Sequence, residues 1–82
     1  MTAAIAFPNN EKYRPGAIVV HRKDGDMGRL TYSTSGLSVC GRQYVEGYGN
    51  THFQTLGEPA HIVAKHWRIA TDEEVRRYFD GN

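Results

Sequence analysis

Residues 13–32 constrain the fold of this chain more than any other stretch of its sequence. Pro15 fixes one backbone torsion and Gly16 permits a bend, and a short run rich in β-branched residues follows at positions 17–20. Residues 23–28 then supply two glycines and two aspartates, which tolerate positive φ angles and close tight turns. Residues 29–32 resume an extended pattern. The stretch therefore predicts a β-hairpin.

The size and charge of the chain narrow the classes of protein to which it can belong. Its 82 residues make one domain with a thin core. The net charge of +1, from 10 basic and 9 acidic residues, gives the whole chain no electrostatic preference for nucleic acid. Cys40 is the single cysteine, which favours a reducing compartment, so we expect a cytoplasmic protein. The sequence has no long apolar run and no signal-peptide pattern at residues 1–7, so we expect no membrane partner.

Three stretches after the hairpin carry strand signals. Residues 37–45 alternate between two sides, and Gly41 in their middle predicts a bulge or a close approach of another backbone. Residues 51–56 are a further candidate strand between two turn-rich segments. Residues 61–67 predict a short fifth strand, or a strand that runs into a single helical turn.

Residues 1–12 are interpreted as an N-terminal arm, pinned by Phe7 and Tyr13 to a domain of residues 13–82.

The C-terminal segment carries the clearest helix signal in the chain. Thr71 and Glu74 have the spacing of a capping box, in which each side chain binds the other residue's backbone amide. The helix predicted to begin there has about nine residues, too few to be stable alone. Its apolar face must therefore pack on the body of the protein, and the spacing assigns three residues to it: Val75, Tyr78 and Phe79.

Together these patterns predict a mainly β protein: a small five-stranded SH3-like barrel with a short C-terminal α-helix. An open antiparallel sheet with the helix across one face is the alternative architecture. In either case we expect Trp67 to be a buried anchor under the final helix, with Ile69 and Phe79 beside it.

The first hairpin resembles the opening of the KOW/Tudor-like class of SH3-like barrels, and within it the RNA-polymerase-interacting domain of CarD-type regulators. The resemblance rests on Pro15-Gly16, the strand Ile18-Val19-Val20-His21, Gly25 and the segment Met27-Gly28-Arg29. It covers about a quarter of the chain. It implies an SH3-like barrel and a partner in the transcription apparatus.

A second resemblance is to the plasmid-borne type II dihydrofolate reductases, which are also small SH3-like barrels. It rests on residues that match that family's arm and first strand: Phe7, Pro8, Asn10, Tyr13, Gly16 and Val19. The family's folate and cofactor site centres on a Val-Gln-Ile-Tyr strand, and the nearest segment here, residues 60–63, lacks both the glutamine and the tyrosine. We therefore take this likeness as an indication of the fold and discount the activity.

Aromatic and basic residues near the hairpins are the candidate binding residues. In Tudor-like barrels, rings at such positions line the ligand groove, where they stack on bases, hold cations or anchor a peptide. The alternative is that these rings only cover the thin core, an interpretation that applies first to Phe53 and second to Tyr32. The basic residues of the first hairpin either meet phosphate or form a solvated, mixed-charge surface. The candidate set is Arg22, Lys23, Arg29, Tyr32, Tyr44 and Tyr48.

Metal binding and nucleophilic catalysis have weaker support. Four histidines accompany Cys40, but no pair has the short spacing typical of a zinc site. Cys40 paired with a histidine would resemble a nucleophile and its base, yet a barrel this small encloses little space from water. We therefore interpret Cys40 as a small hydrophobic residue. We expect no metal, no cofactor and no catalytic residue.

These observations favour a non-enzymatic binding module whose partner is a protein belonging to a cellular machine, such as the transcription apparatus. Small accessory or regulatory proteins of phages and plasmids are similar in size and style. The first alternative is a barrel that binds nucleic acid, which salt would reveal because phosphate contacts weaken steeply as salt rises. The second alternative is a reductase, which a test of nicotinamide binding would reveal. The sequence leaves the oligomeric state open.

Overall fold

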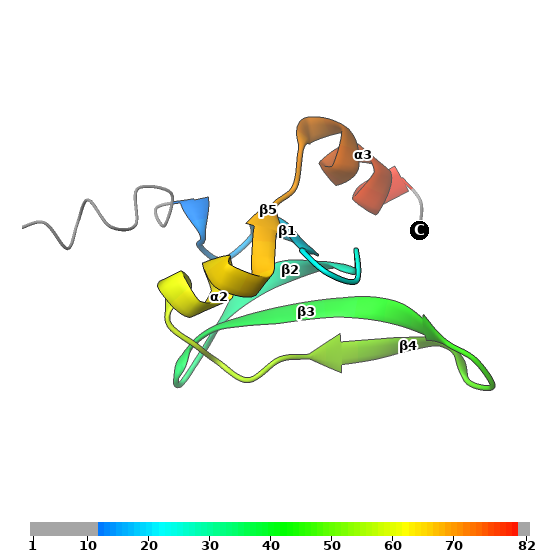
Figure 1. Ribbon diagram of the computed structural model, residues 1–82, viewed down its shortest axis with the longest axis horizontal. Helices are drawn as coiled ribbons and strands as arrows, with labels where there is room; N and C mark the ends of the chain where they lie inside the picture. The colour runs from blue at the N-terminus through cyan, green and yellow to red at the C-terminus, as the bar shows by residue number, and fades with distance from the viewer. Residues whose placement is uncertain (1–11, 81–82) are drawn as a thin grey trace, which may run out of the picture.

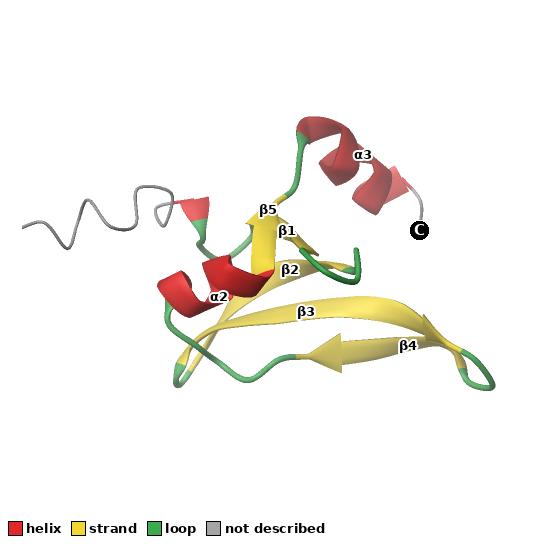
Figure 2. Ribbon diagram, in the orientation of Figure 1, coloured by secondary structure: helices red, strands yellow, loops and turns green. Residues whose placement is uncertain are grey.

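The computed structural model describes residues 12–80, so the arm expected at residues 1–12 lies almost wholly outside the described residues. Five strands form one antiparallel sheet in the order β4-β3-β2-β1-β5 (Figures 1 and 2). The strands are β1 (Ile18–His21), β2 (Met27–Ser33), β3 (Gly36–Val45), β4 (Gly49–Gln54) and β5 (Trp67–Ile69). The helices are α2 (Ala60–His66), between β4 and β5, and α3 (Asp72–Asp80), at the end.

The sheet is a meander whose last strand returns beside the first. Consecutive strands β1 to β4 pair as hairpins, and β5 pairs with β1 through Val19 and Ile69. The mainly β class, the five antiparallel strands and the terminal helix are therefore confirmed. The sheet does not close on itself, because β4 and β5 remain its two edges among the described strands. In this respect it matches the open antiparallel alternative.

The main core lies on the face of the sheet that α2 covers. Val19, Leu30 and Val39 are at most 1% exposed and come from three neighbouring strands. Trp67 is only 8% exposed, which confirms its predicted burial, and its ring stacks on Phe53 with centroids 6.1 Å apart. The Tyr13 hydroxyl donates a 2.7 Å hydrogen bond to the Trp67 carbonyl and so ties the start of the described chain to β5.

Two glycines face each other where β2 and β3 cross the core. Gly28 pairs with Gly41, and a Cβ on Gly41 would lie 2.5 Å from the Met27 carbonyl oxygen and 2.8 Å from Cζ of Phe53. The predicted close backbone approach at Gly41 is therefore correct. The register through Gly41 is continuous, so the position is not a bulge.

The prediction of a strand over residues 61–67 is wrong. The segment forms the helix α2, and the strand begins only at Trp67. Short apolar runs do not distinguish a strand from a buried helical turn, and here the helix directs Val63 into the core. For the same reason the segment at residues 60–63 supplies no strand equivalent to that of the type II reductases.

The helix α3 packs on the other face of the sheet, over β1 and the end of β5. Val75 and Tyr78 contact the small cluster formed by Ile18, Val20 and Ala70, as predicted for these two residues. Phe79 is 60% exposed, so its predicted place on the packed face is wrong. Trp67 belongs to the opposite face, under α2, so the expectation that it lies beneath the final helix is also wrong. Strand alternation explains this, because Trp67 and Ala70 are three residues apart and point to opposite faces.

Candidate functional site

The hairpin of β3 and β4 projects beyond the rest of the sheet. Pairing of β3 with β2 stops at Gly41, whereas pairing of β3 with β4 continues to Val45 and Gly49. Figure 1 shows this hairpin extending past the turn between β1 and β2, at the same end of the sheet. Among the described strands, the projecting part therefore pairs only within its own hairpin.

Glycines make the turn at the tip of this hairpin possible. The Tyr48 amide donates a 2.9 Å hydrogen bond to the Val45 carbonyl, which closes the turn. Gly47 and Gly49 have φ angles of 91° and 77°, a region that L side chains rarely adopt. Between these glycines Tyr48 is 81% exposed, and Tyr44 on β3 is 73% exposed. The turn and the adjoining strand thus each place one large ring in solvent.

The strand register gathers basic and polar side chains on one face of β2, β3 and β4. Arg29, Cys40 and Gln54 form one row across the three strands, and Arg42 pairs with His52 in the next. Alternation puts Tyr44 and Asn50 on the same face. We call this surface the basic face; its residues are Arg29, Cys40, Arg42, Tyr44, Asn50, His52 and Gln54.

Arg29 and Arg42 give the basic face its positive charge. None of its residues is acidic, and every one except Cys40 is exposed. The helix α3 packs on the same side of the sheet but over β1 and the end of β5, where it meets Ile18, Val20 and Ala70. Within the described residues, therefore, the part of this face that lies on β3 and β4 has no helix packed on it.

The structure brings together only some of the predicted binding residues. Arg29 and Tyr44 lie on the basic face, Tyr48 is at its tip, and Lys23 is in the neighbouring turn. Tyr32 is 77% exposed but lies at the far end of β2, opposite Leu37 on the other face. Four of the six candidates therefore lie at the hairpin end, Tyr32 lies apart from them, and Arg22 contacts α2 instead.

Arg22 has a structural contact that the sequence did not predict. Its Nε and Nη2 donate to the Ala64 carbonyl oxygen at 3.1 and 2.9 Å, and its amide donates to the His66 carbonyl at 2.8 Å. These bonds satisfy carbonyl groups in the last turn of α2, which have no hydrogen-bond donor within the helix. Arg22 thus anchors α2 to the first hairpin.

Arg42 and His52 are members of the basic face that sequence reasoning missed. The alternation in residues 37–45 already placed Arg42 on the same side as Cys40 and Tyr44, so that signal was present. His52 joins them only through the pairing of β3 with β4, which depends on the turn geometry.

The histidines and Cys40 form no metal-binding cluster in the described chain. No three His, Cys, Asp or Glu side chains among residues 12–80 gather closely enough to hold a metal ion. His21 instead accepts hydrogen bonds at Nδ1 from the amides of Lys23 and Asp24, at 3.3 and 3.1 Å. The His21 and Trp67 rings pack edge to face with centroids 4.8 Å apart, so His21 joins the first turn to β5.

A polar depression of about 330 Å³ lies between the turn after β2 and the segment that follows β4. Its lining is uncharged and consists of Ser33, Thr34, Ser35, Ser38, Gln54, Thr55, Leu56 and Gly57. Ser38 is 1% exposed, and its hydroxyl has no hydrogen-bond partner. Because the Ser38 oxygen itself is inaccessible, a ligand in the depression would not reach it directly.

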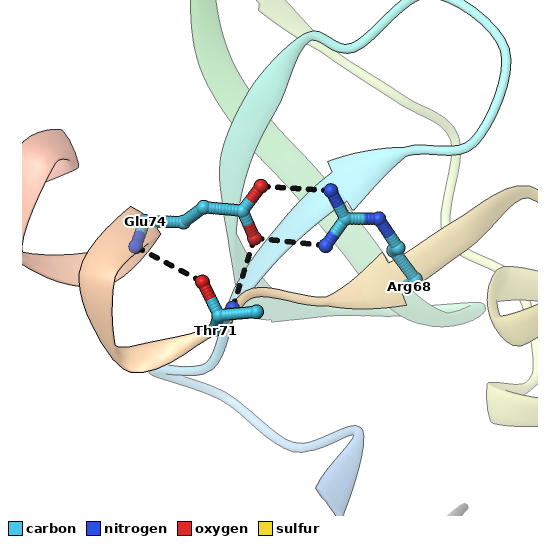
Figure 3. Close-up of polar contacts among 3 residues, drawn as sticks. All are labelled: Arg68, Thr71 and Glu74. Atoms are coloured by element: carbon cyan, nitrogen blue, oxygen red, sulfur yellow. Dashed lines mark hydrogen bonds and ion pairs between the residues drawn. The ribbon is translucent and has the colours of Figure 1, made fainter.

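The strongest ion pair of the described chain stabilises the start of α3 (Figure 3). Arg68 donates from Nη1 and Nη2 to the two carboxylate oxygens of Glu74, at 2.8 and 2.7 Å. The Thr71 amide donates to the same carboxylate at 2.9 Å, and the Glu74 amide donates to the Thr71 hydroxyl at 3.2 Å, which confirms the predicted capping box. The hydrogen bonds from Arg68, with that from Thr71, lower the pKa of Glu74 from 4.5 to about 2.

Comparison with known proteins gives no match: no family model, no curated protein and no solved structure matches the chain. In the part of the chain between Lys12 and Asp80, no helix is long and apolar enough to cross a membrane.

Proposed function

We propose that this chain is a non-enzymatic binding module that recognises a protein partner through the projecting β3–β4 hairpin and the basic face. The observation that carries the proposal is the exposure of Tyr44 and Tyr48, at 73% and 81%, on the part of the hairpin that pairs with no other described strand. Tyrosine and arginine are enriched among residues that dominate binding energy. Arg29 and Arg42 flank Tyr44 along the same face.

The free edge of β4 supports a protein partner. The Thr55 amide donates to the Val39 carbonyl, and hydrogen-bonded pairs alternate along antiparallel strands. The amide and carbonyl groups of Asn50, His52 and Gln54 therefore point away from β3, toward the open edge. A partner strand can add to such an edge, with its main chain supplying affinity and the neighbouring side chains supplying specificity.

The resemblance of the first hairpin to RNA-polymerase-interacting domains makes the transcription apparatus the first partner to test. An accessory or regulatory factor needs no catalytic group. It needs an exposed binding surface that is supported by a well-packed element. The hairpin meets this requirement, because the core contact between Gly41 and Phe53 supports its base.

The test compares two tyrosines of similar exposure. Affinity capture from the native host, with mass spectrometry at low and high salt, identifies the partner, and its dissociation constant is then measured for each variant. Tyr48→Ala should cost about 1–3 kcal/mol of binding free energy and leave the melting temperature unchanged. Tyr32→Ala, at the opposite end of β2, should change neither quantity. The proposal is wrong if both variants bind equally well, or if Tyr48→Ala lowers only the melting temperature.

Nucleic acid is the second candidate partner, favoured by the absence of carboxylates from the basic face. Phosphate contacts from Arg29 and Arg42 would make affinity fall steeply with salt. In that case Arg42→Ala should reduce the slope of log affinity against log salt by about one. A slope near zero for the wild-type protein would eliminate this candidate.

A further inference from the structure

A second candidate site lies along the outer edge of β5, away from the basic face. A pocket of about 230 Å³ is lined there by Lys12, Tyr13, Arg22, Arg68 and Ile69. These residues come from the start of the described chain, the first turn and the last strand, so only the folded protein brings them together. We call this the edge pocket.

The charge of the edge pocket is positive. Three of its five lining residues are basic and none is acidic. Glu74 compensates Arg68 through the ion pair at the start of α3, which leaves the charges of Lys12 and Arg22 without an acidic partner among the described residues. An excess of about two positive charges matches an oxyanion that carries two negative charges.

Both guanidinium groups are held in place before any ligand binds. Arg22 is fixed by the Ala64 carbonyl through Nε and Nη2, which leaves the Nη1 protons for another acceptor. Arg68 is fixed by Glu74 through Nη1 and Nη2, which leaves Nε. Donors that are already oriented lose little conformational entropy on binding, so more of the interaction energy contributes to the binding affinity.

The backbone of β5 adds a neutral donor. The Ala70 amide donates to the Ile18 carbonyl, and the Arg22 amide donates to the His66 carbonyl. Pairs alternate along an antiparallel ladder, so the Ile69 amide points away from β1, toward the pocket that Ile69 lines. Tyr13 contributes a wall rather than a donor, because its hydroxyl already donates to the Trp67 carbonyl.

We propose that the edge pocket binds a phosphate group, either as the free ion or as the monoester of a small molecule. Its donors are the Lys12 ammonium, the free guanidinium protons of Arg22 and Arg68, and the Ile69 amide. Its volume is below the roughly 300–1,000 Å³ of pockets for drug-sized ligands, which suits a small anion. The proposal is independent of the proposed protein partner, because the two sites share no residue.

The experiment follows the backbone amide of Ile69 by NMR in the full-length protein. Inorganic phosphate and methyl phosphate are added in separate titrations, with sodium chloride adjusted to hold the ionic strength constant. Either anion should produce a saturable shift of the Ile69 resonance. Tighter binding of methyl phosphate would identify a monoester as the ligand, and tighter binding of inorganic phosphate would identify the free ion.

Two lysine variants separate a specific site from general screening. Lys12→Gln should weaken phosphate binding about tenfold, as expected for loss of one charge-assisted contact. Lys65→Gln removes the same charge from an exposed position on α2 that does not line the pocket, so it should leave binding unchanged. A shift without saturation, or equal weakening by both variants, would overturn the proposal.

Discussion

The substitution Gly41→Ala tests how closely β2 and Phe53 approach the base of the hairpin. Gly41 does not have a positive φ angle, so an alanine adds no torsional strain there. Its Cβ would, however, lie 2.5 Å from the Met27 carbonyl oxygen and 2.8 Å from Cζ of Phe53. The phenyl ring can rotate away, but the carbonyl belongs to the neighbouring strand and cannot move without disturbing the sheet. The substitution should therefore destabilise the fold.

The magnitude follows from two opposing effects. Overpacking in a well-packed core costs about 1–3 kcal/mol, whereas replacing a strand glycine by alanine recovers about 0.5–1 kcal/mol of backbone entropy. Because the closest contact is with a backbone oxygen, the overpacking cost should lie in the upper part of its range, about 2–3 kcal/mol, and subtracting about 1 kcal/mol leaves a net loss of unfolding free energy of about 1–2 kcal/mol. For a domain of this size that corresponds to a fall in melting temperature of about 5–15 °C.

Thermal unfolding followed by circular dichroism measures this change. His52→Ala is a suitable control, because His52 is exposed on the adjacent strand and should change stability by less than about 0.5 kcal/mol. If Gly41→Ala melts at or above the wild-type temperature, the close packing at the base of the hairpin is refuted.

Three further predictions concern the C-terminal part of the chain. Thr71→Ala should cost about 0.5–2 kcal/mol by loss of the cap, measured by urea denaturation, whereas Thr71→Ser keeps the hydroxyl and should cost little. The pKa of Glu74 is lower in the folded state, about 2 against 4.5, so its stabilising effect is complete above pH 4.5 and is lost as the pH falls toward 2. NMR titration of the Glu74 carboxyl checks this, and a folded-state midpoint near 4.5 would contradict it. The fluorescence of Trp67 should be blue-shifted in the native state and move to the red on unfolding; a native spectrum typical of exposed tryptophan would disprove its burial.

Features that depend on neighbouring residues were predictable from the sequence. The hairpin over residues 18–33, the long strand β3 and the capping box of α3 follow from turn chemistry, alternation and cap spacing. Each requires only contacts within a few residues or between adjacent strands. The mainly β class and the first four strands followed for the same reason, whereas the fifth strand lies at Trp67–Ile69 and not over residues 61–67.

The tertiary structure decided whether residues 61–67 became helix or strand, and which side of the sheet each end of β5 faces. Both depend on which face of the sheet has apolar residues to be covered. Here it is the face of the main core, where Val63 and Trp67 pack. It also decided which exposed residues meet. His52 joins the basic face through strand register, and Lys12, Arg22 and Arg68 line one pocket although they are distant in the chain. Sequence patterns report local periodicity and cannot report such proximity, because it arises only when separate elements pack together.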